Sequence, residues 1–239
     1  MEKQIQFSII IPAFNEEKYI AKSIKFAQEQ QGGFDMEIIV VNNASTDKTK
    51  QIAESLGVLV VDEPKKGVGQ ARKTGTEVAR GEYILHIDAD THLPEDYLQQ
   101  VYKRFQKDSE LVCLGGQFYF YDANLFWYFV RPVLFHLFYW FSKITLKKDP
   151  GPAGNNMVFK KNIYNQTTGF NPKLNYAEDM DLSKKLHKIG KVKLDMKLRC
   201  YVSARRYKLF RKDLWVYAAN FFSICLRGKR YKNVLSEHK

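Results

Sequence analysis

A chain of 239 residues, 45% of them hydrophobic, can build one domain with a sizeable core, which excludes an intrinsically disordered protein. The 38 Lys and Arg residues outnumber the 26 Asp and Glu residues, and the net charge of +12 predicts attraction to nucleotide phosphates, nucleic acid or acidic lipids. Three cysteines without CxxC spacing exclude a disulfide framework and a cysteine zinc site. With no signal peptide after the polar start, we expect a cytoplasmic protein.

The first ninety residues alternate short apolar runs with helical patterns. Runs of β-branched residues between helices are typical of strands buried on both faces of a parallel sheet. The pattern therefore predicts an α/β fold, with a mostly parallel central sheet flanked by helices. The expected strands cover residues 7–11, 38–41, 58–61 and 83–87, and the expected helices cover residues 17–30, 47–56 and 69–79.

The second half has a different pattern. We expect a strand over residues 111–121, a small-residue loop over 151–156, a helix over 179–189 and a basic helical tail over 209–232. This divides the chain into a catalytic domain, 1–208, and a helical extension, 209–239. The catalytic domain would hold a nucleotide-binding half, about 1–110, and an acceptor half, about 111–208.

One stretch, Leu125 to Leu146, is unusually apolar, with 16 apolar residues of 22 and nine aromatic rings. Arg131, Pro132 and His136 interrupt it, so we do not expect it to span a bilayer. Two interpretations stay open: a helix lying in the headgroup layer of a membrane, or a helix packed inside the protein or against another subunit. The net charge favours peripheral association with an anionic membrane.

The most informative site is Asp88-Ala89-Asp90, directly after the expected strand 83–87. Alternate residues of an extended segment share a face, so both carboxylates should project from the carboxyl end of the strand, where open α/β sheets bind ligands. With no Lys or Arg close by in the sequence, the two charges repel unless a divalent cation, Mg²⁺ or Mn²⁺, neutralises them. The alternative is an exposed acidic turn.

Polar loops follow the other strands and should lie on the same rim. Phe14 could stack on a base, Asn42 or Asn43 could bond the edge of that base, and Arg72 could reach a phosphate or a base carbonyl. Glycine lets a backbone approach a ligand closely. Considered singly, each loop is also explained by ordinary helix capping or a surface arginine. The candidate nucleotide-binding residues of these loops are Pro12, Ala13, Phe14, Asn15, Glu16, Asn42, Asn43, Gly67 and Arg72.

A second acidic pair, Glu178-Asp179, opens the expected helix 179–189. The dipole of that helix should lower the pKa of a carboxylate at its start. An ionised carboxylate beside a sugar could take the proton of an acceptor hydroxyl. The alternative is ordinary charge decoration of a helix end.

Together these segments resemble the family-2 inverting glycosyltransferases, which have a Rossmann-like nucleotide-diphospho-sugar transferase fold. The matching segments are IIIPAFNEE, IIVVNNASTDKT, KKGVGQARKTG, GEYILHIDAD, GPAGNNMVFKK, GFNPKL and AEDMDLSKKLHKIG. The resemblance spans about residues 5–190, and the order and spacing of the segments make it more specific than any one motif.

The resemblance implies a role for each matching residue. The residues that would contact the nucleobase are Phe14, Asn42 or Asn43, and Arg72. The residues that would bind the diphosphate and its Mn²⁺ or Mg²⁺ are Asp88 and Asp90, and Ala89 between them would also belong to the nucleotide site. Asp179, with Glu178 beside it, would act as the general base. Gly154 and Asn155 would lie in the loop that lines the acceptor side. Direct displacement would invert the anomeric carbon.

Two departures from the family pattern affect the function. Asn42 stands where an Asp usually follows the Val, so the donor can be UDP-linked or GDP-linked. The Gln/Arg-x-x-Arg-Trp motif of processive members is absent, and Ser203 to Tyr207 takes its place, so we expect addition of a single sugar. Arg205 or Arg206 would neutralise the leaving diphosphate.

The expected acceptor is a glycan or a lipid-linked molecule of the cell envelope, reached at the inner face of the membrane. A synthase that loads sugar onto polyprenyl phosphate is the alternative. Two other classes remain: a basic nucleic-acid-binding protein and a catalytically dead sugar-nucleotide binder. Dispersed Lys and Arg residues without a nucleic-acid-binding signature oppose the first, so no nucleic acid is expected as partner. The candidate carboxylates, all present, oppose the second. The oligomeric state stays unpredicted.

Overall fold

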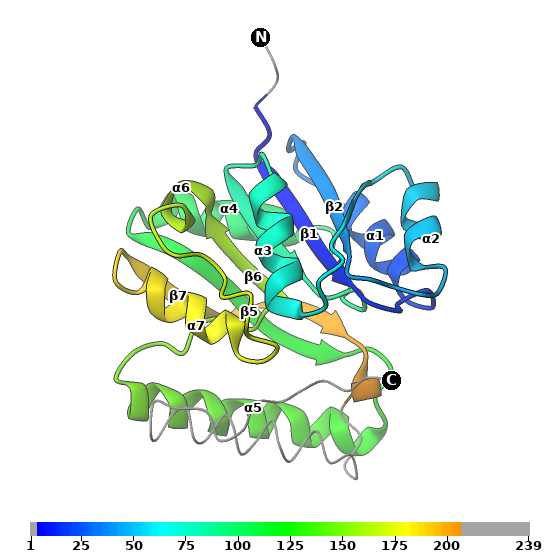
Figure 1. Ribbon diagram of the computed structural model, residues 1–239. Coiled ribbons are helices and arrows are strands. Elements are labelled where there is room, and N and C mark those ends of the chain that lie inside the picture. The colour runs from blue at the N-terminus through cyan, green and yellow to red at the C-terminus, as the bar shows by residue number, and fades with distance from the viewer. Residues whose placement is uncertain (1–3, 207–239) are drawn as a thin grey trace.

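Seven strands form one sheet in the computed structural model, which describes residues 4–206 (Figure 1). The strands are β1 Phe7–Ala13, β2 Met36–Asn42, β3 Leu59–Asp62, β4 Tyr83–Ile87, β5 Leu111–Phe120, β6 Asn156–Lys160 and β7 Lys191–Val202. Their order is β3-β2-β1-β4-β6-β5-β7. Within residues 4–206, β6 is the one strand that runs antiparallel to its neighbours, so the predicted mostly parallel sheet is confirmed.

Helices cover both faces of the sheet. They are α1 Ile20–Gln28, α2 Thr49–Ser55, α3 Val68–Val78, α4 Tyr97–Lys107, α5 Leu125–Leu146, α6 Lys161–Tyr164 and α7 Glu178–Leu186, followed by a 3₁₀ turn, Ala204–Arg206. Helices α1, α2 and α4 share one apolar core with the sheet, and α3, α6 and α7 share the other. Successive strand residues point to opposite faces, so Ile9 and Ile11 enter the first core and Ile10 enters the second.

The chain order places a switch point between β1 and β4. The chain runs outward from β1 through β2 to β3 and then returns to the other side of β1 as β4. Ligands of open α/β sheets bind outside the carboxyl ends of strands at such a point.

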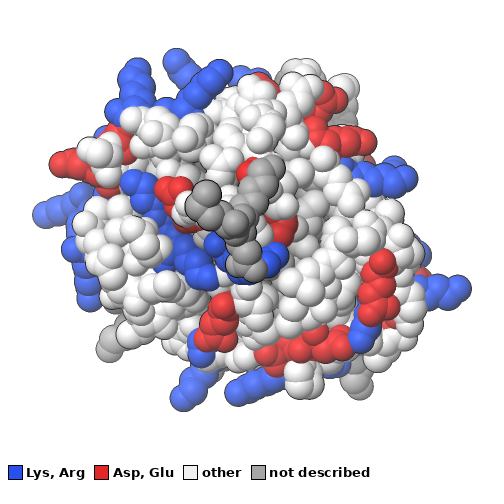
Figure 2. Space-filling model, turned by 90° about the horizontal axis from the view of Figure 1, so that it is seen from above, with Lys and Arg blue, Asp and Glu red and all other residues white. Residues whose placement is uncertain are grey.

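The opposite face, at the amino ends of the strands, carries Lys and Arg side chains together with Asp and Glu side chains around its rim (Figure 2).

Helix α5 lies along one end of the molecule and packs against β5 (Figure 1). Arg131, which interrupts the apolar sequence, is buried, and its guanidinium carbon lies 4.3 Å from the ring centroid of Phe118 and 4.5 Å from that of Phe135. The arginine therefore anchors the helix. The face away from the sheet exposes apolar side chains, and no helix within residues 4–206 is long and apolar enough to cross a membrane. The strongly exposed ones are Leu125, Phe126, Tyr128, Phe129, Val133, Leu137, Trp140 and Ile144.

The elements predicted in the first half agree with the structure to within a few residues at each end. Four elements were not predicted from the sequence, α4, β6, α6 and β7, and Asn156, which opens β6, was assigned to a loop. The predicted tail helix, 209–232, lies outside the described residues. The division into a catalytic domain and an extension stays a prediction.

Candidate active site

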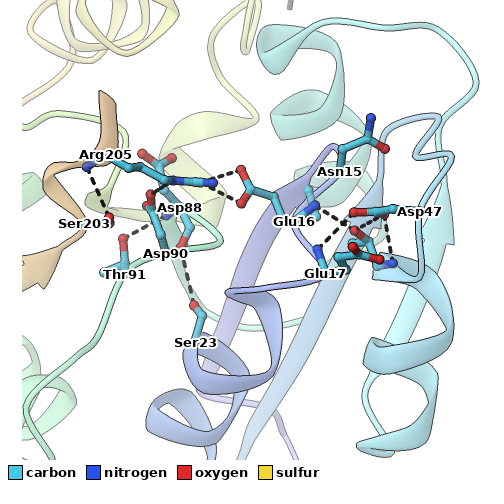
Figure 3. A network of polar contacts seen from close by, with 12 residues as sticks. Asn15, Glu16, Glu17, Ser23, Asp47, Asp88, Asp90, Thr91, Ser203 and Arg205 are labelled. Carbon is cyan, nitrogen blue, oxygen red and sulfur yellow. Dashed lines mark hydrogen bonds and ion pairs between the residues drawn. The ribbon is translucent and has the colours of Figure 1, made fainter. Parts of the chain in front are cut away.

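The loop after β1 is held by the loop after β2 (Figure 3). The backbone N–H of Glu16 donates to Thr49 Oγ1 at 2.7 Å, and that of Glu17 donates to Asp47 Oδ2 at 3.1 Å. Asn15 takes a left-handed conformation, with φ of 55°, that turns the chain away from the strand. The predicted nucleotide-binding loop is thus fixed in position before any ligand binds.

The two asparagines after β2 serve as connectors between loops. Asn42 Nδ2 donates to Asp62 Oδ1 at 2.8 Å. Asn43 Nδ2 donates to the carbonyl oxygen of Lys65 at 2.8 Å, and its Oδ1 accepts from Gly67 N at 2.8 Å. Both ends of the Asn43 amide are therefore engaged, and they hold Gly67, with φ of 144°, at the start of α3.

Phe14 is the half-buried ring of this region. Lys66 Nζ lies 4.6 Å from the centroid of that ring. Ala13 and Ala89, both predicted to bind nucleotide, have buried side chains, so they can offer a ligand little beyond their backbone. Pro12 belongs to β1 and directly precedes Ala13.

Asp88 and Asp90 do not lie on an extended segment, and that prediction is wrong. Strand β4 ends at Ile87, and Thr91 N donates to the carbonyl oxygen of Asp88 at 2.9 Å, which closes a tight turn. Thr91 Oγ1 also accepts from Asp88 N at 3.2 Å. The carboxylates still leave the carboxyl end of a central strand, but a turn, not strand pleating, directs them (Figure 3).

The expectation that the two aspartates lack basic neighbours is also wrong. Asp88 Oδ1 accepts from Arg72 Nη2 at 2.8 Å, and Asp90 Oδ2 accepts from Arg205 Nε at 2.8 Å. These arginines stand 16 and 115 residues away in the sequence, so local inspection could not find them.

Arg72 is buried and joins three segments that are distant in sequence. Besides Asp88 it binds Glu178, with Nε donating to Oε1 at 3.1 Å. Gly154 packs on its guanidinium, because a Cβ at position 154 would approach Nη2 to 2.5 Å. The backbone N–H of Gly154 in turn donates to Asp179 Oδ2 at 2.8 Å. One guanidinium therefore contacts one carboxylate of each acidic pair.

The acidic pair at the start of α7 has raised pKa values, so the predicted lowering by the helix dipole is wrong. Burial and, after it, the charge of Asp179 raise the pKa of Glu178 to about 7, against the opposing charge of Arg72. Burial also raises the pKa of Asp179, against hydrogen bonds from Gly154 N and from Met180 N, the latter at 2.7 Å. Loss of water around two adjacent carboxylates outweighs the helix terminus.

Arg205 closes the other side of the site (Figure 3). Its Nη2 donates to both carboxylate oxygens of Glu16 at 2.6 Å, and its Nε binds Asp90. Its guanidinium carbon lies 4.0 Å from the ring centroid of Tyr19. The side chain of Arg206 lies outside the described part of the structure.

The donor set fits a divalent cation that arrives with a diphosphate. Mg²⁺ in phosphoryl-binding sites takes one or two carboxylates and completes its shell with water and phosphate oxygens, and Asp88 with Asp90 can supply that share. No group of three or more His, Cys, Asp or Glu side chains within residues 4–206 could hold a metal on its own. Arg72 Nη1 and Asn155 Oδ1 are among the buried polar atoms of residues 4–206 that lack a hydrogen-bond partner.

Comparison with known proteins identifies the family. Residues 8–168 match the sequence model described as Glycosyl transferase family 2, and this range is more than half of the chain. The chain belongs to glycosyl transferase family 2. A chondroitin synthase of Pasteurella multocida is 30% identical over 204 residues, which are 81% of this chain and 20% of that protein.

A second relative is a poly(ribitol-phosphate) beta-N-acetylglucosaminyltransferase, TarS, of Staphylococcus aureus. It is 31% identical over 102 residues, which are 40% of this chain and 18% of that protein. The family-2 chain thus spans about a fifth of the length of these two curated relatives.

Solved structures confirm the predicted nucleotide-diphospho-sugar transferase fold. A mannosyltransferase from Pyrobaculum calidifontis, in complex with GDP-Man and Mn²⁺, superposes with a TM-score of 0.73 at 19% identity, covering 94% of this chain and 64% of that chain. Residues 1–349 of S. aureus TarS, in complex with UDP-GlcNAc, give 0.66 at 20% identity, covering 84% and 59%. At this identity the likeness concerns the fold alone.

The structure gathers the predicted residues of this glycosyltransferase chain into three contact groups. Phe14, Asn43 and Gly67 meet through the loop before α3; Arg72, Asp88, Gly154, Glu178 and Asp179 form the second group; Glu16, Asp90 and Arg205 form the third. The sequence analysis missed Tyr19 and Thr91. The signal for Thr91 was its hydroxyl directly after the acidic pair; Tyr19 gave none, because its partner is 186 residues away in sequence.

The raised pKa of Glu178 predicts a pH-dependent stability. Between the ordinary pKa of 4.5 and the folded value of about 7, the native chain binds more protons than the unfolded chain, so the free energy of unfolding falls as pH rises. Glu178→Gln removes that titration. Urea unfolding between pH 5 and pH 8 in EDTA should therefore show a steeper loss of stability in wild type than in this variant.

The matched control is Glu77→Gln, which removes an exposed glutamate on α3. It should leave the pH profile of wild type unchanged. Equal slopes for wild type and Glu178→Gln would contradict the raised pKa.

Proposed function

We propose that this chain is an inverting glycosyltransferase that moves one sugar from a UDP-linked or GDP-linked donor to an acceptor hydroxyl. The observation that carries the proposal is the Arg72 guanidinium, which binds Asp88 on the donor side and Glu178, beside Asp179, on the acceptor side. Two relatives are named as a chondroitin synthase and a beta-N-acetylglucosaminyltransferase, and similar structures hold GDP-Man or UDP-GlcNAc; these names support this reaction class.

The donor would bind at the carboxyl ends of β1, β2 and β4. Asp88 and Asp90 would hold a Mn²⁺ or Mg²⁺ ion, which when bound stabilises negative charge on the departing nucleotide diphosphate. Phe14 would offer its ring to the base, and Asn42 or Asn43 would contact the base edge. Both asparagine side chains are already hydrogen-bonded within the protein, so either would meet the base in a fixed orientation.

Asp179 would act as the general base, and its greater exposure supports giving it a different role from that of Glu178. Glu178 is 6% exposed and bound to Arg72, whereas Asp179 is half-buried and reachable from the surface. Hydrogen bonds from Gly154 N and Met180 N fix the Asp179 carboxylate, and its raised pKa brings its basicity closer to neutral pH. Glu178 would position Arg72.

The reaction would be a direct displacement. The acceptor oxygen bonds to the anomeric carbon as the bond from that carbon to the diphosphate oxygen breaks, and Asp179 takes the hydroxyl proton. Attack from the face opposite the leaving group inverts the configuration, and no protein nucleophile takes part. The residues involved all lie within the proposed catalytic domain, 1–208.

The acceptor would be a glycan or a lipid-linked molecule of the cell envelope, met at an anionic membrane. The exposed apolar face of α5, with Lys143, Lys147 and Lys148 exposed at its carboxyl end, supports this location. Apolar and aromatic side chains flanked by lysines suit the boundary between headgroups and acyl chains. This face also favours the alternative of a polyprenyl-phosphate acceptor.

Replacement of the proposed base should remove chemistry and spare donor binding. Asp179→Asn keeps the shape of the side chain but cannot take a proton, so the transfer rate should fall by roughly 10²–10⁴-fold. The donor dissociation constant should stay close to that of wild type, because Asp179 is assigned to the acceptor. Steady-state transfer assays and calorimetric donor titrations measure the two quantities.

Glu178→Gln is the comparison for that experiment, because it should cost less activity than Asp179→Asn. If Asp179→Asn turns over at the wild-type rate, or if Glu178→Gln is the inactive variant, Asp179 is not the base.

Loss of the exposed apolar face of α5 should release the protein from membranes. Wild type should float with vesicles containing anionic lipid at low salt, and Phe129→Ser with Leu137→Ser should remain at the bottom of the gradient, because both side chains point away from the sheet. The control replaces two exposed apolar residues elsewhere, Leu59→Ser with Val78→Ser, and should float like wild type. If wild type does not bind such vesicles, the membrane interpretation is wrong, and the exposed face of α5 would instead pack against protein.

A further inference from the structure

Arg205 makes the densest set of ionic contacts at the site, with no part in the proposed proton transfer. Its Nε donates to Asp90 Oδ2 at 2.8 Å, and its Nη2 reaches both oxygens of Glu16 at 2.6 Å. Asp90 is 4% exposed and Glu16 is 5% exposed. One guanidinium therefore bridges two nearly buried carboxylates from the ends of two neighbouring strands (Figure 3).

A buried acid pair needs a positive partner. Taking carboxylates out of water is costly unless an opposite charge and hydrogen bonds compensate, and two carboxylates held together also repel each other. Arg205 provides that compensation for Glu16 and Asp90. A divalent cation bound to Asp90 would provide it equally well, and the guanidinium and the cation would repel each other at one carboxylate.

The backbone around Arg205 is anchored by hydrogen bonds through Ser203. Ser203 Oγ donates to Asp122 Oδ2 at 2.6 Å, and Arg205 N donates to Ser203 Oγ at 3.2 Å. The guanidinium lies against the ring of Tyr19, which offers a face but no fixed hydrogen bond. Displacement of the guanidinium would thus break its bonds to Glu16 and Asp90 and leave the anchored turn in place.

We propose that Arg205 is a displaceable internal counter-ion, which neutralises Glu16 and Asp90 until a divalent cation enters and expels it. The inference rests on the proposed function, because it assigns Asp90 to the cation of the donor. The device keeps the acid pair compensated in the empty enzyme and makes cation binding weaker than the bare carboxylates would give. The expelled guanidinium, still tethered beside the site, then faces the negative diphosphate of the donor.

The test is Mn²⁺ binding in the absence of nucleotide, measured by calorimetry on the whole chain. In Arg205→Ala the acid pair has lost its competitor, and Mn²⁺ should bind at least about tenfold more tightly than to wild type, the factor expected from one charged hydrogen bond that no longer has to be broken. Asp90→Asn added to Arg205→Ala should abolish the gain, which locates it at this carboxylate.

Arg80→Ala is the matched control, because it removes the same charge from an exposed arginine that is also paired with a carboxylate, Glu37. It should bind Mn²⁺ like wild type, so a gain seen there too would trace to net charge and overturn the proposal. Arg205→Lys keeps the charge but cannot bond both carboxylates in the same way, and it should fall between wild type and Arg205→Ala. If Arg205→Ala does not fold, Arg205→Lys decides by the same criterion.

Equal or weaker Mn²⁺ binding after loss of Arg205, or no binding at all, would overturn the proposal. Transfer assays on wild type, run in parallel, test the proposed function separately. If wild type transfers no sugar but Arg205→Ala shows the predicted gain in Mn²⁺ affinity, the proposed function is wrong and the counter-ion role of Arg205 is still supported.

Discussion

The site depends on the burial of the Arg72 guanidinium. A buried cation is tolerated only with carboxylates against it, and Arg72 finds Asp88 at the end of β4 and Glu178 at the start of α7. These residues are separated by 90 positions in sequence, and they belong to the donor side and the acceptor side of the proposed reaction. The ion pairs therefore couple the two halves of the site.

The surroundings of Arg72 show the cost of that arrangement. Only glycine fits at position 154, because a Cβ there would collide with the guanidinium. The backbone N–H of Gly154 donates to Asp179. Burial raises the pKa values of Glu178 and Asp179, although Arg72 and the helix N-terminus act to lower them. Arg205 repeats the principle on the other side, where one guanidinium compensates Glu16 and Asp90. Local compensation, and not the net charge of +12, organises the charges of the site.

The central sheet and the location of the site could be predicted from the sequence, because both rest on local patterns. Continuous apolar runs such as Phe7 to Ile11 occur in strands covered on both faces, and the Asp88–Asp90 motif directly follows such a run. Strand β7 alternates exposed and buried residues over part of Lys191–Val202, and α4 places Leu98, Val101 and Phe105 on one face. The spacing of apolar residues in the sequence therefore indicated both elements, although neither was predicted.

The ionic contacts could not be predicted, because their partners meet only in the folded chain. Arg72 and Glu178 are 106 residues apart, and Arg205 and Glu16 are 189 residues apart. The pKa values of the acidic pair were predicted in the wrong direction for the same reason. The helix dipole is visible in the sequence, whereas the burial that outweighs it depends on how β6, α7 and α3 pack together.

The most direct test of this account is Arg72→Lys, with the donor dissociation constant and the transfer rate at saturating donor measured on one preparation. Lysine keeps the positive charge but lacks the planar fork that binds Asp88 and Glu178 together. If Arg72 couples the two sides, donor affinity should fall and the transfer rate should fall as well, each by about tenfold or more, since one charged hydrogen bond is lost on each side. A variant that binds donor weakly but transfers sugar at the wild-type rate would contradict the coupling.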